Sequence, residues 1–156
     1  MDSVIHWLKQ NKSHVVAQIV KRIYAELPDY RQRSLEEMTV GAAMAYDQWC
    51  STVEHNDLMR HAAQAQTVIQ RNIAHNYDPA QVARVPAIIC EVVLTLLDQA
   101  EGSVNPSERT LFHTRAKRMT ATILGVGGMK IAGTYLQKTI GDSVPESPTP
   151  HDPSKS

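Results

Sequence analysis

Hydrophobic residues recur at helical spacing along most of the chain. Between positions 14 and 27 they fall on one stripe, at Val15, Val16, Ile19, Val20, Ile23 and Leu27. This i, i+3, i+4 pattern predicts an amphipathic helix. Similar patterns run from 34 to 53, from 58 to 75 and from 79 to 100, after a short helix near residues 4–8. No segment shows the two-residue alternation of a strand, so the pattern predicts an all-α fold.

Polar residues that can cap helices stand at the expected starts. Side chains of Ser, Asp and Asn before a helix accept hydrogen bonds from its first free N–H groups. Ser34 is followed three residues later by Glu37, which is a capping box. Asp78 and Asn105 each precede a proline, the residue that suits the first helical position. We also expect Asp2 or Ser3 to cap the first helix and Asp57 to cap the helix that begins at Leu58.

The segment AIICEVVLTLL, residues 87–97, is apolar on nearly every face. A helix of that kind is buried among others. We therefore predict that it forms the centre of the core, with Pro86 kinking the helix or splitting it in two, because proline removes a backbone hydrogen bond. The predicted core residues are Ile88, Ile89, Val92, Val93, Leu96 and Leu97.

The last predicted helix runs from Pro106 to about Ile140 and is long for a small domain. Its roughly 35 residues would span about 50 Å, more than one compact core needs. Small residues in it let a second backbone approach closely, so we predict a homodimer whose interface includes Gly127, Gly128, Ala132 and Gly133. The Pro- and Ser-rich segment 142–156 reads as a disordered linker, leaving residues 1–141 as the folded domain.

Composition narrows the possible partners. The chain has 156 residues, and its 16 basic side chains match its 16 acidic ones, so its formal net charge is zero. A nucleic-acid binder needs a basic surface, and so does electrostatic attachment to an anionic membrane. The sequence shows no signal peptide, no apolar run near the roughly 20 residues of a membrane span, and no CxxC pair. We expect a cytoplasmic protein that binds neither membrane nor nucleic acid.

No residue pattern points to catalysis or to a metal. His6 and His14, or His55 and His61, lie too far apart in sequence for the i, i+4 pairs that hold an ion. No glutamate has a histidine three residues on, as di-iron bundles require. We therefore predict no enzyme activity, no cofactor and no metal. Cys50 and Cys90 read as core thiols, and the basic residues Arg115, Lys117 and Arg118 as a solvated face.

The order of features resembles the N-terminal sensor domain of the stressosome co-antagonist (RsbR-type) family. The resemblance covers about Val4 to Ile140. It rests on the opening helix with Trp7-Leu8, the second helix ending at Leu27-Pro28-Asp29-Tyr30, the start at Ser34-Leu35-Glu36-Glu37, the Arg71–Tyr77 segment before Asp78-Pro79, and the long last helix. The resemblance implies a non-haem, globin-like helical domain that dimerises and leads into an output domain. We expect this chain to be either an excised sensor half or a stand-alone relative with a disordered tail.

These observations predict a non-enzymatic sensory or regulatory domain, active in signalling such as a stress response. A signal would change packing in the body and move the last helix, which acts on an output module or partner. One alternative is a haem- or tetrapyrrole-binding globin-type sensor, for which His75 is the candidate ligand. Two others are a helical enzyme or small-ligand carrier, which needs a polar-lined cavity, and an adaptor that binds a partner through an exposed helix face.

Overall fold

The computed structural model describes residues 1–122, with the side chain of His61 left aside, and all regular elements in that range are helical. This confirms the all-α prediction for the described part. The helices are α1 (Asp2–Gln10), α2 (Lys12–Glu26), the short 3₁₀ helix η1 (Pro28–Gln32), α3 (Leu35–His55), α4 (Leu58–Ala74), α5 (Pro79–Gln99) and a last helix described over residues 106–122. The predicted interface residues Gly127, Gly128, Ala132 and Gly133 and the predicted tail 142–156 lie outside the described residues.

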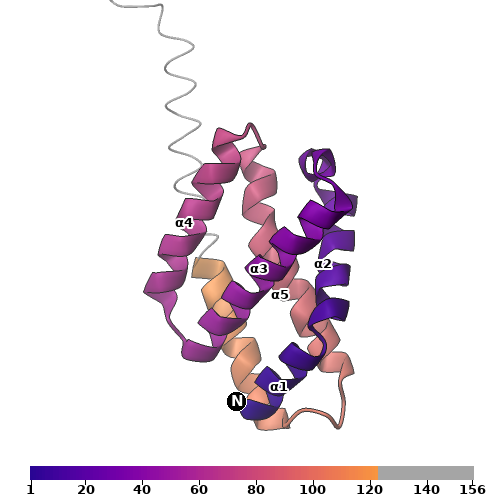
Figure 1. Ribbon diagram of the computed structural model, residues 1–156. Helices are drawn as coiled ribbons and strands as arrows, with labels where there is room; N and C mark the ends of the chain where they lie inside the picture. Colours follow the sequence, from indigo (N-terminus) through magenta and orange to yellow (C-terminus); the bar gives the residue numbers. More distant parts are fainter. Residues whose placement is uncertain (123–156) are drawn as a thin grey trace, which may run out of the picture.

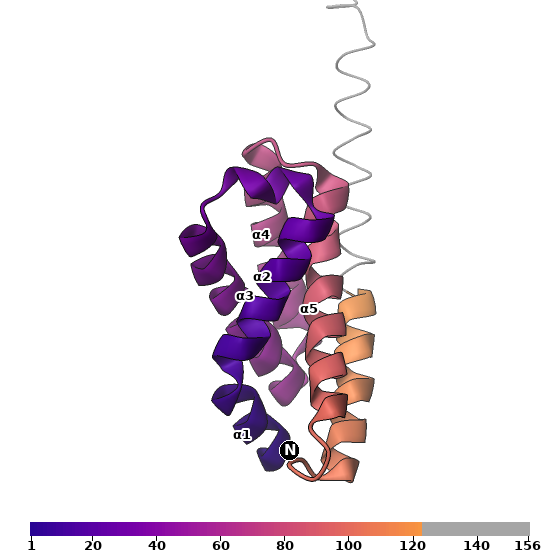
Figure 2. The same cartoon turned by 90° about the vertical axis from the view of Figure 1, so that its right-hand side faces the viewer.

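Helix α5 lies at the centre of the arrangement. It packs against α2 and α4, while α3 packs against α1, α2 and α4. In Figure 1, α3 crosses in front of α5 at an angle. After the loop at 100–105 the chain turns back, so the 106–122 helix runs beside α5 in the opposite direction (Figure 2).

The core forms where these helices face one another. Trp49 of α3 and Phe112 of the last helix are buried and meet edge to face, with ring centroids 5.8 Å apart. Of the six core residues predicted in α5, five are buried: Ile88, Ile89, Val92, Val93 and Leu97. Leu96 is only partly buried, so the prediction was wrong there. Its neighbour Leu97 is fully buried, because adjacent helical residues point in different directions.

The predicted caps account for most helix starts. The side chain of Ser34 accepts a hydrogen bond from the backbone N–H of Glu37, and three more predicted caps are confirmed in the same way, at Asp57, Asp78 and Asn105. The first helix differs from the prediction. Met1 occupies its N-cap position and no side chain caps it, because the helix already begins at Asp2 and both predicted caps lie inside it. The hydroxyl of Ser3 contacts Glu108 instead.

Pro86 does not split α5. The helix runs unbroken from Pro79 to Gln99 with the proline inside it, so of the two predicted alternatives, a kink or a split, the split was wrong. A proline in a helix interior removes one backbone hydrogen bond and costs about 3 kcal/mol. Burial of the apolar residues that follow it, including Ile88 and Ile89, offsets this cost.

Among the described residues, α5 alone is long and apolar enough to cross a membrane, with a mean hydropathy of 1.7 over its best 18 residues. A helix at the centre of a protein core meets the same criterion. Here α5 carries eight buried residues and has α2 and α4 packed against it. Its apolar character is therefore accounted for by the core.

Candidate functional site

The histidine proposed as a haem ligand lies on the surface. His75 is the C-cap residue of α4 and its side chain is exposed. It lines neither of the two hollows described below. In the described part of the chain, no group of three His, Cys, Asp or Glu side chains could hold a metal ion.

The two cysteines are free thiols within the helical body. Burial raises the pKa of Cys50 to about 12, and burial also raises the pKa of Cys90. The thiolate is the nucleophilic form. Both side chains therefore stay protonated at neutral pH, as expected of thiols that serve in packing.

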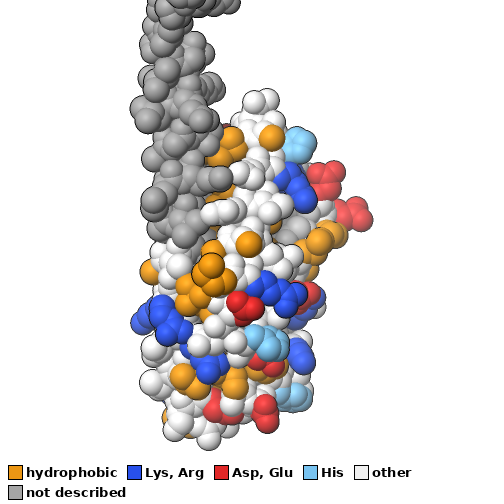
Figure 3. All heavy atoms as spheres, turned by 90° about the vertical axis from the view of Figure 1, so that its left-hand side faces the viewer, with side chains coloured by type: hydrophobic (Ala, Val, Ile, Leu, Met, Phe, Trp, Pro, Cys, Tyr) orange, Lys and Arg blue, Asp and Glu red, His pale blue; other side chains and the backbone are white. Residues whose placement is uncertain are grey.

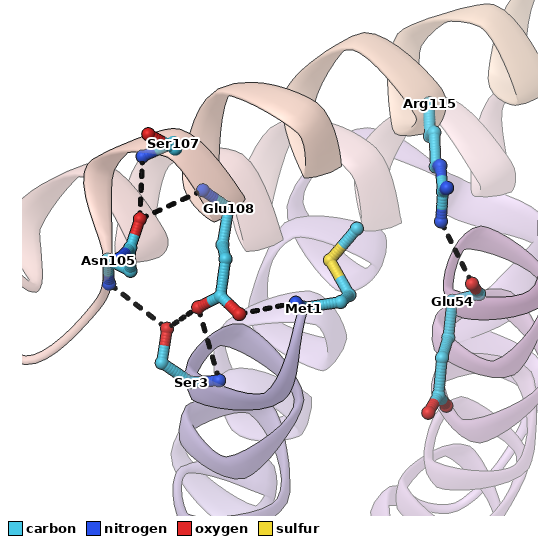
Figure 4. A network of polar contacts seen from close by, with 7 residues as sticks. All are labelled: Met1, Ser3, Glu54, Asn105, Ser107, Glu108 and Arg115. Carbon is cyan, nitrogen blue, oxygen red and sulfur yellow. Dashed lines mark hydrogen bonds and ion pairs between the residues drawn. The ribbon is translucent and has the colours of Figure 1, made fainter.

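A polar cluster joins the chain's first residues to the start of the last helix (Figure 4). The carboxylate of Glu108 accepts hydrogen bonds from the amino group of Met1 and from the hydroxyl of Ser3. The hydroxyl of Ser3 also accepts from the backbone N–H of Asn105, at 3.0 Å. The bonds from the Met1 ammonium and Ser3 lower the pKa of Glu108. This cluster fixes α1 against the 106–122 helix.

Two arginines of the last helix reach the end of α3. Arg115 donates to the backbone carbonyl of Glu54, at 3.0 Å, and Arg118 donates to the side-chain oxygen of Asn56. The last carbonyls of a helix have no partner within it and carry partial negative charge. A guanidinium there supplies both a donor and a favourable charge. Arg115 is half-buried and therefore departs from the solvated face predicted from the sequence, whereas Arg118 is exposed, as predicted.

A third polar cluster lies at the start of α5, and we call it the Arg33 junction. It consists of Arg33, Tyr30, Tyr77 and Asn72. Arg33 donates to the hydroxyl of Tyr77 at 2.7 Å and to the side-chain oxygen of Asn72 at 2.8 Å. Its guanidinium also lies over both tyrosine rings, which stack with their centroids 4.9 Å apart. Tyr30, Tyr77 and Asn72 are buried, so the contacts of this arginine with buried groups hold η1 to the α4–α5 turn.

Two of the hollows on the surface of the described residues have polar linings. The first lies between α3 and α4, has a volume of about 240 Å³ and includes Asp47, Ser51, His55, Asp57 and Arg60 in its lining. Most of these groups already have structural partners. Lys12 binds Asp47 at 2.6 Å, His55 bonds to the carbonyl of Ser51 at 2.8 Å, and Asp57 caps α4.

The second hollow lies between the end of α5 and the last helix, and we call it the Asp98–His113 hollow. Its volume is about 360 Å³ and it is open to solvent. Small-molecule sites typically measure about 300–1,000 Å³, so this hollow falls inside that range and the first falls below it. Its lining is Asp98, Arg109, Thr110, His113, Thr114 and Lys117.

A close ion-pair contact fixes one side of the Asp98–His113 hollow. Nε2 of His113 lies 2.7 Å from Oδ1 of Asp98, and the His113 side chain is only 20% exposed. A carboxylate can only accept a hydrogen bond, so Nε2 carries the proton. The carboxylate thereby sets the orientation of the imidazole ring.

This arrangement lacks the parts of a nucleophilic enzyme. An aspartate that orients a histidine is two-thirds of a catalytic triad, which also requires a hydroxyl or thiol bonded to the other ring nitrogen. The nearby hydroxyls of Thr110 and Thr114 donate instead to backbone carbonyls one helical turn earlier, at 3.0 and 3.1 Å. Within the described residues the hollow offers charge and hydrogen bonds, which are the means of binding.

The face shown in Figure 3 carries charges of both signs. Acidic, basic and histidine side chains lie mixed among hydrophobic ones on that face, which contains α4. This agrees with the formal net charge of zero.

Comparisons with protein-family models, with curated proteins and with solved structures gave no match to this chain. The functional argument therefore depends on the residues themselves.

One signal in the sequence was missed. Arg109, His113 and Lys117 are spaced four residues apart, so they share one face of a helix. Lys117 lies close in sequence to Arg115 and Arg118, and this proximity hides the helical face that it shares with Arg109 and His113. The contact between Asp98 and His113 could not have been found from helical spacing. It depends on how the loop at 100–105 places α5 beside the last helix.

Proposed function

We propose that this chain is a non-enzymatic sensory or regulatory domain that works as a homodimer in the cytoplasm, away from membranes and nucleic acid. A signal received by the helical body shifts the last helix. That helix then acts on an output module or on a signalling partner. The mechanism is a change in the populations of two packing arrangements.

The observation that carries this proposal is the set of contacts made by the 106–122 helix. Glu108 ties it to the N-terminus and α1, and Arg115 ties it to the end of α3. His113 ties it to α5. A displacement of any of these elements therefore acts on the same helix, which is what a transmitting element requires.

The proposed arrangement is globin-like. In support, the described residues fold into successive helices around one central, apolar helix, and α3 crosses that helix at an angle (Figure 1). The proposed homodimer is supported by the sequence of the chain beyond the described residues. Gly127, Gly128, Ala132 and Gly133 supply small side chains there.

Analytical ultracentrifugation tests the homodimer directly. We expect the mass of two chains at micromolar concentration, and a Gly128→Leu variant with a weaker or altered dimer. Gly41→Leu is the matched control, because a Cβ at Gly41 in α3 would meet no other atom within 4 Å. A wild-type monomer, or equal effects of the two substitutions, would contradict the proposal.

A further inference from the structure

Two cations in the Asp98–His113 hollow have no partner among the described residues. Neither the Arg109 side chain nor the Lys117 side chain forms an ion pair or hydrogen bond with the described residues, although Asp98 lies in the same hollow. The carboxylate of Asp98 is engaged by His113 instead. The hollow therefore holds one carboxylate against two unpaired cations, so it has a net positive charge even when His113 is neutral.

The environment of Arg109 distinguishes it from other arginines. Arg60 and Arg71 also lack a partner, but their side chains are exposed, whereas Arg109 is half-buried. On the α2–α5 face, by contrast, Arg22 and Arg84 both bind Glu91, at 2.7 and 2.9 Å. A half-buried guanidinium without a hydrogen-bond partner loses hydration that nothing replaces, which is unfavourable unless an anion completes the site.

The spacing of the basic side chains suits a compact anion. Arg109 and Lys117 are separated by two helical turns, about 12 Å along the axis, with His113 midway between them. Their long side chains can reach toward each other over His113. A guanidinium presents two parallel N–H donors that match a phosphate, and a lysine ammonium adds a mobile point charge.

From this geometry we infer that the Asp98–His113 hollow binds the phosphate group of a phosphate monoester, through Arg109 and Lys117 with His113 held beneath them. The remaining volume admits a small organic group next to the phosphate. The bound anion would contact only the last helix directly, and His113 would link it to Asp98 on α5. Its role as the signal rests on the proposed function, whereas the binding itself does not.

Calorimetric titration of the full chain tests the site with two soluble probes, inorganic phosphate and glycerol phosphate. We expect saturable binding of one anion per chain, with glycerol phosphate the stronger. The Arg109→Gln/Lys117→Gln variant should bind at least about tenfold more weakly, since it loses both charge-assisted contacts. It should fold normally, because neither side chain has a partner to lose. Arg60→Gln, which removes an unpaired arginine from the other hollow, is the matched control and should bind like the wild type.

Flotation with phosphatidylcholine vesicles, with and without phosphatidic acid, distinguishes the source of the phosphate. Binding of glycerol phosphate but not of these vesicles assigns a soluble ligand, and binding only to phosphatidic acid vesicles, lost in the double variant, assigns a lipid headgroup. Absence of binding to every probe, or equal weakening by Arg60→Gln, would overturn the inference. If the protein is a dimer but binds no phosphate, only the inferred phosphate site is contradicted. If it is a monomer and binds phosphate, only the proposed dimeric function is contradicted.

Discussion

The two ends of α5 use arginine in opposite ways. At its start, Arg33 bonds to Tyr77 and Asn72 and lies over two stacked rings. At its end, Arg109 lies half-buried beside Asp98 and has no partner in the described part of the chain. A cation that bonds to buried groups stabilises the fold, and one whose side chain has no such partner remains available to a ligand. The Arg33 junction is therefore a structural site, and the Asp98–His113 hollow at the other end of α5 is the proposed binding site.

The largest effect should come from the packing of α5 next to the Asp98–His113 hollow. Leu97→Ala removes a fully buried side chain, and we expect a loss of about 2–5 kcal/mol in the free energy of unfolding. Leu96→Ala is the matched control, because Leu96 is only partly buried and should cost clearly less. Urea denaturation of the two variants measures both values. Equal losses would mean that α5 is rotated from the position described.

The next largest effect should come from the Arg33 junction. Arg33→Ala leaves the buried oxygens of Asn72 and Tyr77 without their donor, and we expect a loss of roughly 2–3 kcal/mol. Arg31→Ala is the control, since the exposed Arg31 donates only to the backbone carbonyls of Tyr24 and Ala25. Its cost should stay under about 1 kcal/mol. If Arg31→Ala proved as costly as Arg33→Ala, the junction would not be the structural site we describe.

The smallest effect should come from the exposed ion pairs that Glu91 forms with Arg22 and Arg84. Hydrogen bonds from Arg84 and Arg22 hold the pKa of Glu91 below the usual range of a glutamate. A carboxylate with a depressed pKa contributes stability at higher pH, and this contribution is lost as the pH falls through the depressed value. The Glu91 side chain is 46% exposed, so the contribution should be under about 1 kcal/mol.

Acid titration of stability measures that contribution. Between pH 7 and pH 3, Glu91→Gln should lose less stability than the wild type, by the small amount that Glu91 supplies. Asp47→Asn, which removes the exposed carboxylate partner of Lys12, provides a comparison for an exposed pair outside α5. If Glu91→Gln lowered the free energy of unfolding at pH 7 by several kcal/mol, these exposed ion pairs would stabilise the protein as much as the Arg33 junction does.

Local signals in the sequence explain how much of the fold could be predicted. Ser34, Asp78 and Asn105 cap helices within a few residues of themselves, so their neighbours were enough to place the helix starts. The all-helical class followed from the spacing of apolar residues. The 3₁₀ helix at 28–32 was not predicted, because Pro28 was interpreted only as the end of the helix before it.

Long-range contacts explain what could not be predicted. Arg33 meets Asn72 across 39 residues, and Glu108 meets Met1 across 107. Such pairs depend on how the helices pack, which the spacing along one helix does not contain. Helical spacing could have placed Arg109, His113 and Lys117 on one face, but the pairing of His113 with Asp98 required the turn between two helices.

Thermal unfolding with and without phosphate tests the central comparison most directly. The wild type, Arg33→Ala and Arg109→Gln/Lys117→Gln are melted at one protein concentration and one ionic strength, with glycerol phosphate about tenfold above its Kd. A ligand that binds only the folded state should then add roughly 1.4 kcal/mol of stability. We predict that Arg33→Ala melts several degrees lower but keeps this gain, and that the double variant melts like the wild type but loses it. A gain that persists in the double variant, or disappears in Arg33→Ala while its fold is intact, would contradict the account.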